Sequence, residues 1–154
     1  QLRIAFDFDG VIASDEAEAV YKESGNLDLF HEHERKLKDK PLHHGPLMPL
    51  LLKISEFQKL ERKKAQSMAE YTQMLRIAIV TARNAPSHER LIHTLSEAGI
   101  DADELFLLGG IEKKLVLDVL KPHIFFDDQI GHLEPASVST PSVHVPFGAA
   151  NFGG

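Results

Sequence analysis

The chain has 154 residues, of which 43% are hydrophobic and 26% charged, and it carries a formal net charge of −6 and no cysteine. This length allows one α/β domain with a small insertion, but not two full domains. The lack of cysteine excludes disulfides, thiolate metal sites and a cysteine nucleophile. The acidic balance argues against nucleic acid as a partner, although a bound metal would still attract a small anionic substrate.

Nothing in the hydropathy pattern predicts contact with a membrane. No apolar run approaches the ~18 residues that a transmembrane helix needs. The apolar residues 2–6 are followed at once by Asp7 and Asp9, so we expect no signal peptide. With the cysteine-free composition, these features predict a cytoplasmic protein. They leave its oligomeric state open.

The first predicted element is a strand over residues 2–6, a short apolar run that ends in acidic residues and a glycine. The spacing Asp15-x-x-Glu18 is typical of a capping box and predicts a helix from Asp15 to about Gly25. Residues 28–40 are polar, and their pattern predicts no element.

A second helix is predicted after Pro49, where apolar residues recur at helical spacing. These residues are expected to pack in the core or against an inserted cap: Leu50, Leu51, Ile54, Phe57 and Leu60. The stretch between Asp9 and Thr81 is too long for a single crossover between parallel strands. It therefore predicts a helical cap over residues 15–73, inserted into a single domain of residues 1–154.

The second half of the chain alternates short strands and helices. Predicted strands cover residues 76–81, 104–108, 123–126 and 143–145, and predicted helices cover residues 87–98 and 112–120. This alternation implies right-handed crossovers and a parallel sheet that is covered on both faces. The predicted fold is α/β: a Rossmann-like parallel sheet of about five strands flanked by helices, with the cap after the first strand.

Polar side chains that suit phosphoryl transfer follow the predicted strands. In chain order they are Asp7, Asp9, Thr81, Lys113, Asp127 and Asp128. Open α/β sheets bind ligands at the carboxyl ends of their strands, so we expect these side chains to converge on one edge. Carboxylates can hold Mg²⁺, attack phosphorus and move a proton, while a lysine and a hydroxyl neutralise phosphate charge. Alternation along an extended chain places Asp7 and Asp9 on one side and Phe8 on the other.

These residues, in this order, resemble the four signatures of the haloacid dehalogenase superfamily, whose fold carries a cap in the same place. The resemblance implies that Asp7 is the nucleophile and that Asp9 is the acid/base, with its backbone carbonyl also on the metal. It implies that the phosphate- or substrate-binding residues are Thr81, Ala82, Arg83 and Lys113. It implies a Mg²⁺ site formed from Asp7, Asp9, Asp127 and Asp128, in which either of the last two is the direct ligand.

Longer stretches look like the cytosolic 5′-nucleotidase type I family, which hydrolyses nucleoside 5′-monophosphates, typically AMP, with Mg²⁺. They are residues 14–18, 80–90, 108–110, 124–129 and 144–148. Two residues depart from that family's pattern: Phe8 stands where the family has glycine, and Gly10 where it has another residue. The resemblance therefore implies phosphatase chemistry more firmly than a preference for one base.

Three other hypotheses stay open. The same site in a phosphatase could serve a sugar phosphate or another small phosphoester. A signalling receiver domain also combines acidic residues, a threonine, a lysine and Mg²⁺, but its phosphorylated aspartate follows the third strand, where this chain has Leu107-Leu108-Gly109. A catalytically inactive phosphate-binding domain is the third hypothesis, and the intact pair Asp7 and Asp9 argues against it.

Some assignments within the site also stay open. Lys114 competes with Lys113, which is preferred because it comes first after the Gly-Gly turn. Arg83 and Asn84 are as compatible with a loop-and-capping role as with contact to phosphate or ribose. Histidines cluster in the predicted cap without metal-ligand spacing, so solvated side chains are expected for His31, His33, His43 and His44.

Overall fold

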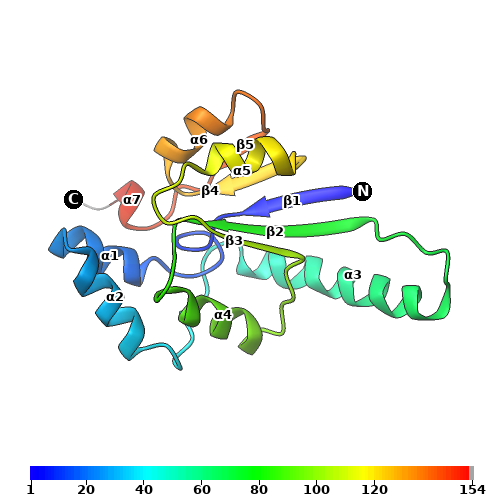
Figure 1. The fold of residues 1–154 in the computed structure, drawn as a ribbon, viewed down its shortest axis with the longest axis horizontal. Coiled ribbons are helices and arrows are strands. Elements are labelled where there is room, and N and C mark those ends of the chain that lie inside the picture. The colour runs from blue at the N-terminus through cyan, green and yellow to red at the C-terminus, as the bar shows by residue number, and fades with distance from the viewer. Residues whose placement is uncertain (153–154) are drawn as a thin grey trace.

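The computed structural model describes residues 1–152 and contains a five-stranded parallel sheet with the strand order β3-β2-β1-β4-β5 (Figure 1). The strands are β1 (Leu2–Phe6), β2 (Leu75–Thr81), β3 (Glu104–Leu107), β4 (Ile124–Asp127) and β5 (Ser142–His144). Every neighbouring pair runs in the same direction. The predicted Rossmann-like α/β fold is therefore confirmed, with each predicted strand present within about two residues of its expected bounds.

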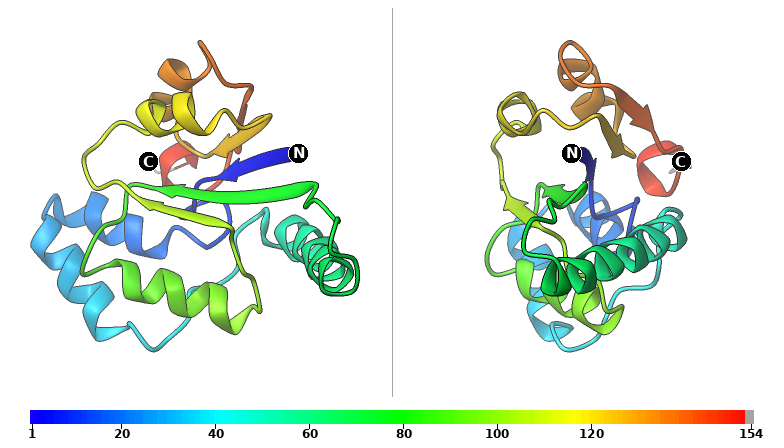
Figure 2. Two further views of the ribbon diagram at one scale, coloured as in Figure 1. Left: turned by 45° about the vertical axis from the view of Figure 1, so that its right-hand side comes forward. Right: turned by 90° about the vertical axis from the view of Figure 1, so that its right-hand side faces the viewer.

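Helices cover both faces of the sheet (Figure 2). They are α3 (Met48–Ser67) and α4 (His88–Glu97) on one face, and α5 (Lys113–Leu120) and α6 (Ile130–Ala136) on the other. Because side chains alternate along a strand, β2 sends Ile77 and Ile79 into the core under α3 and α4. Its Ala78 and Val80 pack under α5 and α6. Burial on both faces explains why this strand reads as one continuous apolar run.

Three short helices gather at the end of the molecule toward which the strands point (Figure 1). They are α1 (Glu16–Ser24), α2 (Leu27–Lys36) and α7 (Ala149–Phe152). The sequence pattern missed α2, α6 and α7. In α2 the only buried residue is Glu34, so no apolar stripe marks the helix. Its start is marked by Asn26, whose side chain accepts hydrogen bonds from the backbone N–H of Asp28 and Leu29.

The helix predicted from Asp15 is present as α1, and it ends at Gly25 in the left-handed conformation, with φ of 62°. The predicted capping box is wrong, because the Asp15 side chain makes no capping hydrogen bond to α1. Its carboxylate accepts instead from the backbone N–H of Ala149 at the start of α7. Glu18 accepts from the side chain of Gln129. A distant tertiary contact has replaced the local bond at each position.

The helix predicted after Pro49 begins earlier and runs further, as α3. Leu51 is fully buried, but Leu50 is 42% exposed and Phe57 and Leu60 are each 63% exposed, so core packing was wrong for these three. Phe57 and Leu60 line a surface cavity together with Leu2, Ile4 and Leu75 of β1 and β2 instead of packing tightly against them. The end of α3 runs toward the side of the molecule where the strands begin (Figure 1). No helix in the described part of the chain combines the length and the apolar character of a membrane span.

The extent of the cap, residues 15–73, stays a prediction. Within that range α1 and α2 lie at the carboxyl edge of the sheet (Figure 1), whereas Met48 and Leu51 of α3 belong to the main core.

Candidate active site

One lysine joins two carboxylates that come from neighbouring strands. Phe6 of β1 pairs with Phe126 of β4, so Asp7 and Asp127 follow side by side at the carboxyl edge. Lys113, the first residue of α5, places its Nζ 2.8 Å from Asp7 Oδ1 and 2.7 Å from Asp127 Oδ2. All three side chains are buried. We call these residues, together with Asp128, the acidic cluster.

The cluster opens onto a cavity of about 380 Å³. That volume lies in the range of about 300–1,000 Å³ that is common for small-molecule sites. Asp7 and Asp9 both line the cavity, while Phe8 between them is fully buried in the core, as the alternation predicts. The remaining lining comes from α1, α2, α6, the last residue of β2 and the loops after β2, β3 and β4: Glu18, Tyr21, Leu27, Phe30, His31, Thr81, Ala82, Arg83, Asn84, Gly109, Gly110, Gln129 and His132.

Burial and charge set the protonation of the acidic cluster. Burial raises the pKa of Asp7 to about 7, although Lys113 opposes the shift. Burial on its own would lower the pKa of Lys113, but Asp7 and Asp127 raise it above its ordinary value. Burial would raise the pKa of Asp127, but the hydrogen bond to His132 and the charge of Lys113 lower it. Lys113 and Asp127 therefore stay charged, while Asp7 exchanges its proton near neutral pH.

Asp128 is the least satisfied group of the acidic cluster. It is 1% exposed, and within residues 1–152 neither of its carboxylate oxygens has a hydrogen-bond partner. Burial, reinforced by Asp7 and Glu18, raises its pKa to about 9. Gly10 lies directly against it, with φ of 75°, and a Cβ there would stand 2.3 Å from Asp128 Oδ2. An unpaired buried carboxylate beside other acidic groups is an environment that a divalent cation stabilises.

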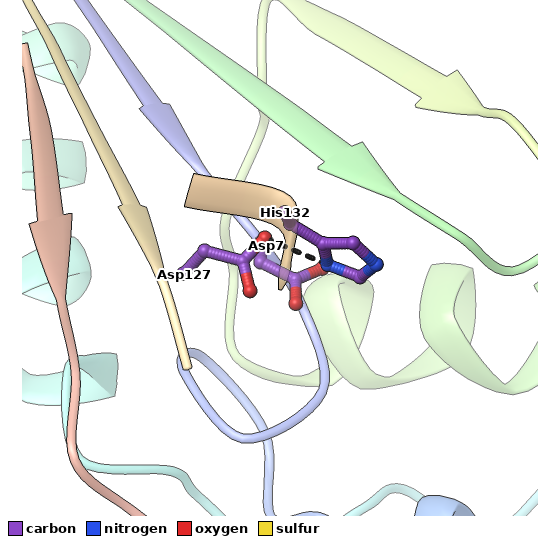
Figure 3. Close-up of side chains that lie close together, drawn as sticks. All are labelled: Asp7, Asp127 and His132. Carbon is purple, nitrogen blue, oxygen red and sulfur yellow. Dashed lines mark hydrogen bonds and ion pairs between the residues drawn. The ribbon is translucent and has the colours of Figure 1, made fainter. Parts of the chain in front are cut away.

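A set of possible metal-binding atoms lies within the described residues. Asp7, Asp127 and His132 each offer one ligand atom, and these atoms lie within 4.8 Å of one another (Figure 3). His132 Nδ1 is 3.2 Å from Asp127 Oδ2. His132 was not predicted from the sequence, although it lies only one helical turn beyond the acidic pair. The carboxylates suit a hard cation such as Mg²⁺, whereas an imidazole is more typical of transition metals.

Arg83 lines the cavity and binds both carboxylate oxygens of Asp9. Its Nε donates to Asp9 Oδ2 and its Nη2 to Asp9 Oδ1, each at 2.7 Å. Its Nη1 donates to Glu34 Oε2 and to the Ser87 carbonyl, each at 2.9 Å. Burial would lower the pKa of Arg83, but Asp9 and Glu34 raise it, so the guanidinium stays charged. The structure thus places this predicted phosphate-binding residue in the cavity wall with most of its donors already bonded.

The same ion pairs continue into α4 and α1. Arg90 Nη1 donates to Glu34 Oε1 at 3.1 Å, its Nη2 donates to Glu16 Oε1, and its Nε donates to the Lys40 carbonyl at 2.9 Å. We call Arg83, Arg90, Asp9, Glu34 and Glu16 the arginine network. The sequence pattern did not indicate Glu34, Glu16 or Arg90, because their pairing joins segments with no regular spacing.

The other predicted residues divide between the site and the surface. Thr81 is buried at the end of β2, and its Oγ1 accepts from the backbone N–H of Arg83 at 3.1 Å. Lys113 lies in the acidic cluster, whereas Lys114 pairs with Asp118 one turn along α5 at the protein surface.

The four histidines do not form one group. His31 lines the cavity, and its Nδ1 lies 2.5 Å from Ser87 Oγ, so it is not the solvated side chain that we expected. His33 is partly buried beside Glu34, at 3.5 Å. His43 and His44 are exposed, as expected. Among residues 1–152, none of these histidines belongs to a possible metal-binding group of three.

The parallel sheet order and the ordered strand-end residues define a haloacid dehalogenase-like domain. Within that class the chain belongs to the 5′-nucleotidase family, because the family model described as 5′-nucleotidase matches residues 1–152. The resemblance inferred from the sequence is confirmed.

A curated human protein, cytosolic 5′-nucleotidase 1B, is 40% identical to this chain over 137 residues. The matched region is 88% of this chain but 22% of the relative, so the chain spans about a fifth of that protein's length. Among solved structures, a chain in "Structure of Pnkp1/Rnl/Hen1 complex" matches with a TM-score of 0.54 at 13% identity, over 93% of this chain and 45% of that one. The structural match shows a shared fold.

Proposed function

We propose that this chain is a Mg²⁺-dependent phosphomonoester hydrolase that acts on nucleoside 5′-monophosphates such as AMP through a phosphoryl intermediate on Asp7. The observation that carries the proposal is the position of Lys113 between Asp7 and Asp127, beside a cavity that Asp7 lines. Membership of the 5′-nucleotidase family and the name of the human relative support the nucleotide substrate. The relative's name also supports a cytoplasmic location.

The hydrogen bonds of Asp7 support its role as the nucleophile toward a phosphate in the cavity. Its Oδ1 accepts from the backbone N–H of Phe8 at 2.7 Å and lies 2.8 Å from Lys113 Nζ. Oδ2 is therefore the oxygen that we expect to bond to phosphorus as the ester oxygen leaves. We expect Lys113, the Thr81 hydroxyl and the backbone of Ala82 to bind the phosphate oxygens and stabilise their charge.

Asp9 is the acid/base of this scheme. It lines the same cavity two residues beyond Asp7. In the first step its carboxyl group gives a proton to the leaving ester oxygen. In the second step the resulting carboxylate takes a proton from the water that attacks the aspartyl-phosphate, which releases inorganic phosphate and restores both side chains.

The side chains of Asp7, Asp127 and Asp128, with the backbone carbonyl of Asp9, would hold the Mg²⁺ ion. The unpartnered oxygens of Asp128 and the raised pKa values of Asp7 and Asp128 support a cation at this place. When bound, the ion supplies positive charge that favours ionised carboxylates and neutralises the phosphate oxygens.

Two aromatic residues that line the cavity favour a nucleoside over a sugar as the leaving group. Tyr21 of α1 and Phe30 of α2 line it, with ring centroids 6.4 Å apart and an interplanar angle of 81°. Their flat apolar surfaces suit the face of a base. We propose that α1 and α2 are the part of the predicted cap that contacts the nucleoside.

The test is phosphate release by the purified chain from nucleoside 5′-monophosphates, their deoxy analogues and sugar phosphates. We expect turnover with Mg²⁺, none in excess chelator, and a preference for AMP and its relatives. Asp7→Asn should abolish turnover, while Asp118→Asn, the same change at the surface of α5, should keep it. Full activity of Asp7→Asn or in chelator would contradict the mechanism. Equal use of sugar phosphates would remove the nucleotide assignment alone.

A further inference from the structure

Glu34 is a buried charge in a helix that otherwise lies near the surface. Its side chain is 0% exposed, and it is the only buried residue of α2. Burying a carboxylate is costly unless its oxygens are paired. Both are paired here, Oε2 with Arg83 at 2.9 Å and Oε1 with Arg90 at 3.1 Å. One of the contacts that join α2 to the domain is therefore ionic, and it is made to Arg83, which lines the cavity.

Arg83 has little freedom to do anything but hold Asp9. A guanidinium carries five N–H donors, and four of those of Arg83 are bonded to Asp9, Glu34 and Ser87. The rings of Phe8 and Phe30 lie 5.4 and 5.7 Å from its Cζ atom. Two parallel hydrogen bonds from a planar fork fix both the position and the plane of the carboxylate that they bind.

We propose that Glu34 is a positioning residue for Asp9. It anchors the Nη1 side of Arg83, and Arg83 then presents the Asp9 carboxylate to the cavity in one orientation. To act as the acid, Asp9 gives up one of its two hydrogen bonds to Arg83 and carries its proton on that oxygen, while the other bond keeps the group in place. The inference rests on the proposed function, in which Asp9 moves the proton. It assigns to Arg83 a role in orienting the acid/base instead of direct contact with phosphate.

Helix α2 connects the residues that line the cavity to Arg83, which orients the residue that transfers the proton. Phe30 and His31, one turn before Glu34 on α2, line the cavity. Phe30 also lies over the Arg83 guanidinium. A substrate that presses on this face of α2 acts on the helix that anchors Arg83. Correct seating of the substrate and correct orientation of Asp9 are thereby coupled through a few direct contacts.

Glu34→Gln tests the proposal, because it keeps the shape of the side chain and removes its charge. General acid–base catalysis contributes about 10²–10⁴-fold in rate. We expect kcat for AMP to fall by at least ~10-fold while KM changes by less than ~3-fold, since Glu34 orients Asp9 and does not touch substrate. Because Asp9 also activates the water of the second step, the two esters are compared in the first step alone. Formation of the aspartyl-phosphate from AMP should slow by at least ~10-fold, while its formation from p-nitrophenyl phosphate, whose leaving group needs no proton, should slow by less than ~3-fold, as measured by the burst of p-nitrophenol.

Glu32→Gln is the matched control, because Glu32 lies on the same helix, is exposed and pairs with Lys36. It should leave both esters unaffected. Glu34→Asp is the second variant, and it keeps the charge in place but draws the carboxylate back by one methylene. It should show the same selective loss on AMP, and it decides the question if Glu34→Gln does not fold.

Equal slowing of aspartyl-phosphate formation from the two esters in the folded variant, a change in KM alone, or no change relative to Glu32→Gln would overturn the proposal. Failure of the proposed function is a separate result. In that case the unmodified chain would hydrolyse neither ester with Mg²⁺.

Discussion

The acidic cluster and the arginine network adjoin at the carboxyl edge of the sheet, and they differ in charge balance. The acidic cluster sets one cation against three carboxyl groups, of which Asp128 holds its proton at neutral pH: Lys113 against Asp7, Asp127 and Asp128. The arginine network sets two cations against three carboxylates: Arg83 and Arg90 against Asp9, Glu34 and Glu16. In the first, both oxygens of Asp128 lack partners within residues 1–152, while in the second each carboxylate is paired.

The difference in charge balance suits the acidic cluster and the arginine network to different tasks. A cluster with more acidic groups than cations is stabilised when a further cation binds, so the acidic cluster is suited to bind Mg²⁺ and phosphate. A fully paired network gains nothing from a further ion and has well-defined geometry, so it is suited to hold Asp9 in place. Neighbouring residues of one short segment, Asp7 and Asp9, thus belong to different electrostatic environments.

Removing the only cation of the acidic cluster should have the largest effect. Lys113→Met leaves Asp7 and Asp127 facing each other without a counter-charge and deprives the phosphate of one partner. We expect kcat/KM for AMP to fall by at least ~10²-fold, as for the loss of one preorganised donor. Lys114→Met on the same helix should stay within ~2-fold, because Lys114 pairs only with Asp118 at the surface. Equal losses in the two variants would remove Lys113 from the site.

Proton release should accompany binding of Mg²⁺ to the acidic cluster. The pKa of Asp7 is raised to about 7 and that of Asp128 to about 9, so both carboxyl groups must lose protons to bind the ion. We expect the affinity for Mg²⁺ to rise by up to ~100-fold per pH unit below pH 7, where both groups carry protons, and by up to ~10-fold per pH unit from pH 7 to 8, where mainly Asp128 does. Calorimetric titration in two buffers of different ionisation enthalpy measures the protons released. An affinity that is constant across this range would contradict the account.

The raised pKa of Asp128 also predicts how the stability of the folded chain changes with pH when no Mg²⁺ is bound. The folded chain binds a proton at Asp128 that the unfolded chain loses above its ordinary pKa of 3.8. The contribution of this group to stability is complete below about pH 4 and is lost as the pH rises toward about 9. With Mg²⁺ bound, this fall should shrink, and thermal unfolding across pH with and without chelator checks it. A contribution that grew with pH in chelator would have the wrong sign.

The smallest expected effect concerns the contact between Gly10 and Asp128. Gly10→Ala adds a methyl group where φ is 75° and where Asp128 Oδ2 is 2.3 Å away. Gly25→Ala is the matched control, since Gly25 has φ of 62° and no atom within 4 Å. The left-handed conformation alone should cost about 1 kcal/mol in each variant. Gly10→Ala should cost at least about 1 kcal/mol more and weaken Mg²⁺ binding, as denaturant unfolding and titration would show. Equal costs would mean that the contact is unimportant.

The acidic cluster could be predicted from the sequence because it depends on the ends of strands. Apolar runs that end in Asp7, Thr81 and Asp127 give both the strands and the edge at which they meet, whatever the details of packing. The choice of Lys113 over Lys114 followed from its place at the turn. Gly10, which departs from the pattern of the resembling family, has its physical reason in the approach of Asp128, and only the folded chain brings the two together.

The arginine network could not be predicted, because each of its pairs joins distant segments. Glu34 lies in a polar stretch whose pattern shows no helix, and its burial follows from two arginines that are far away in the sequence. Phe57 and Leu60 show the opposite error, since they keep helical spacing but face a surface cavity beside β1 and β2 instead of a packed core.

The most direct test of the central claim is to trap the phosphoryl group on the chain. The chain is mixed with AMP and Mg²⁺, quenched in acid within the first turnovers and reduced with borohydride, which converts an aspartyl-phosphate into homoserine. Peptide mass spectrometry then locates the modified residue. We predict homoserine at position 7, present with Mg²⁺ and absent in chelator or in Asp7→Asn. Modification at another residue, or none at position 7 in a chain that is releasing phosphate, would contradict the assignment of Asp7 as the nucleophile.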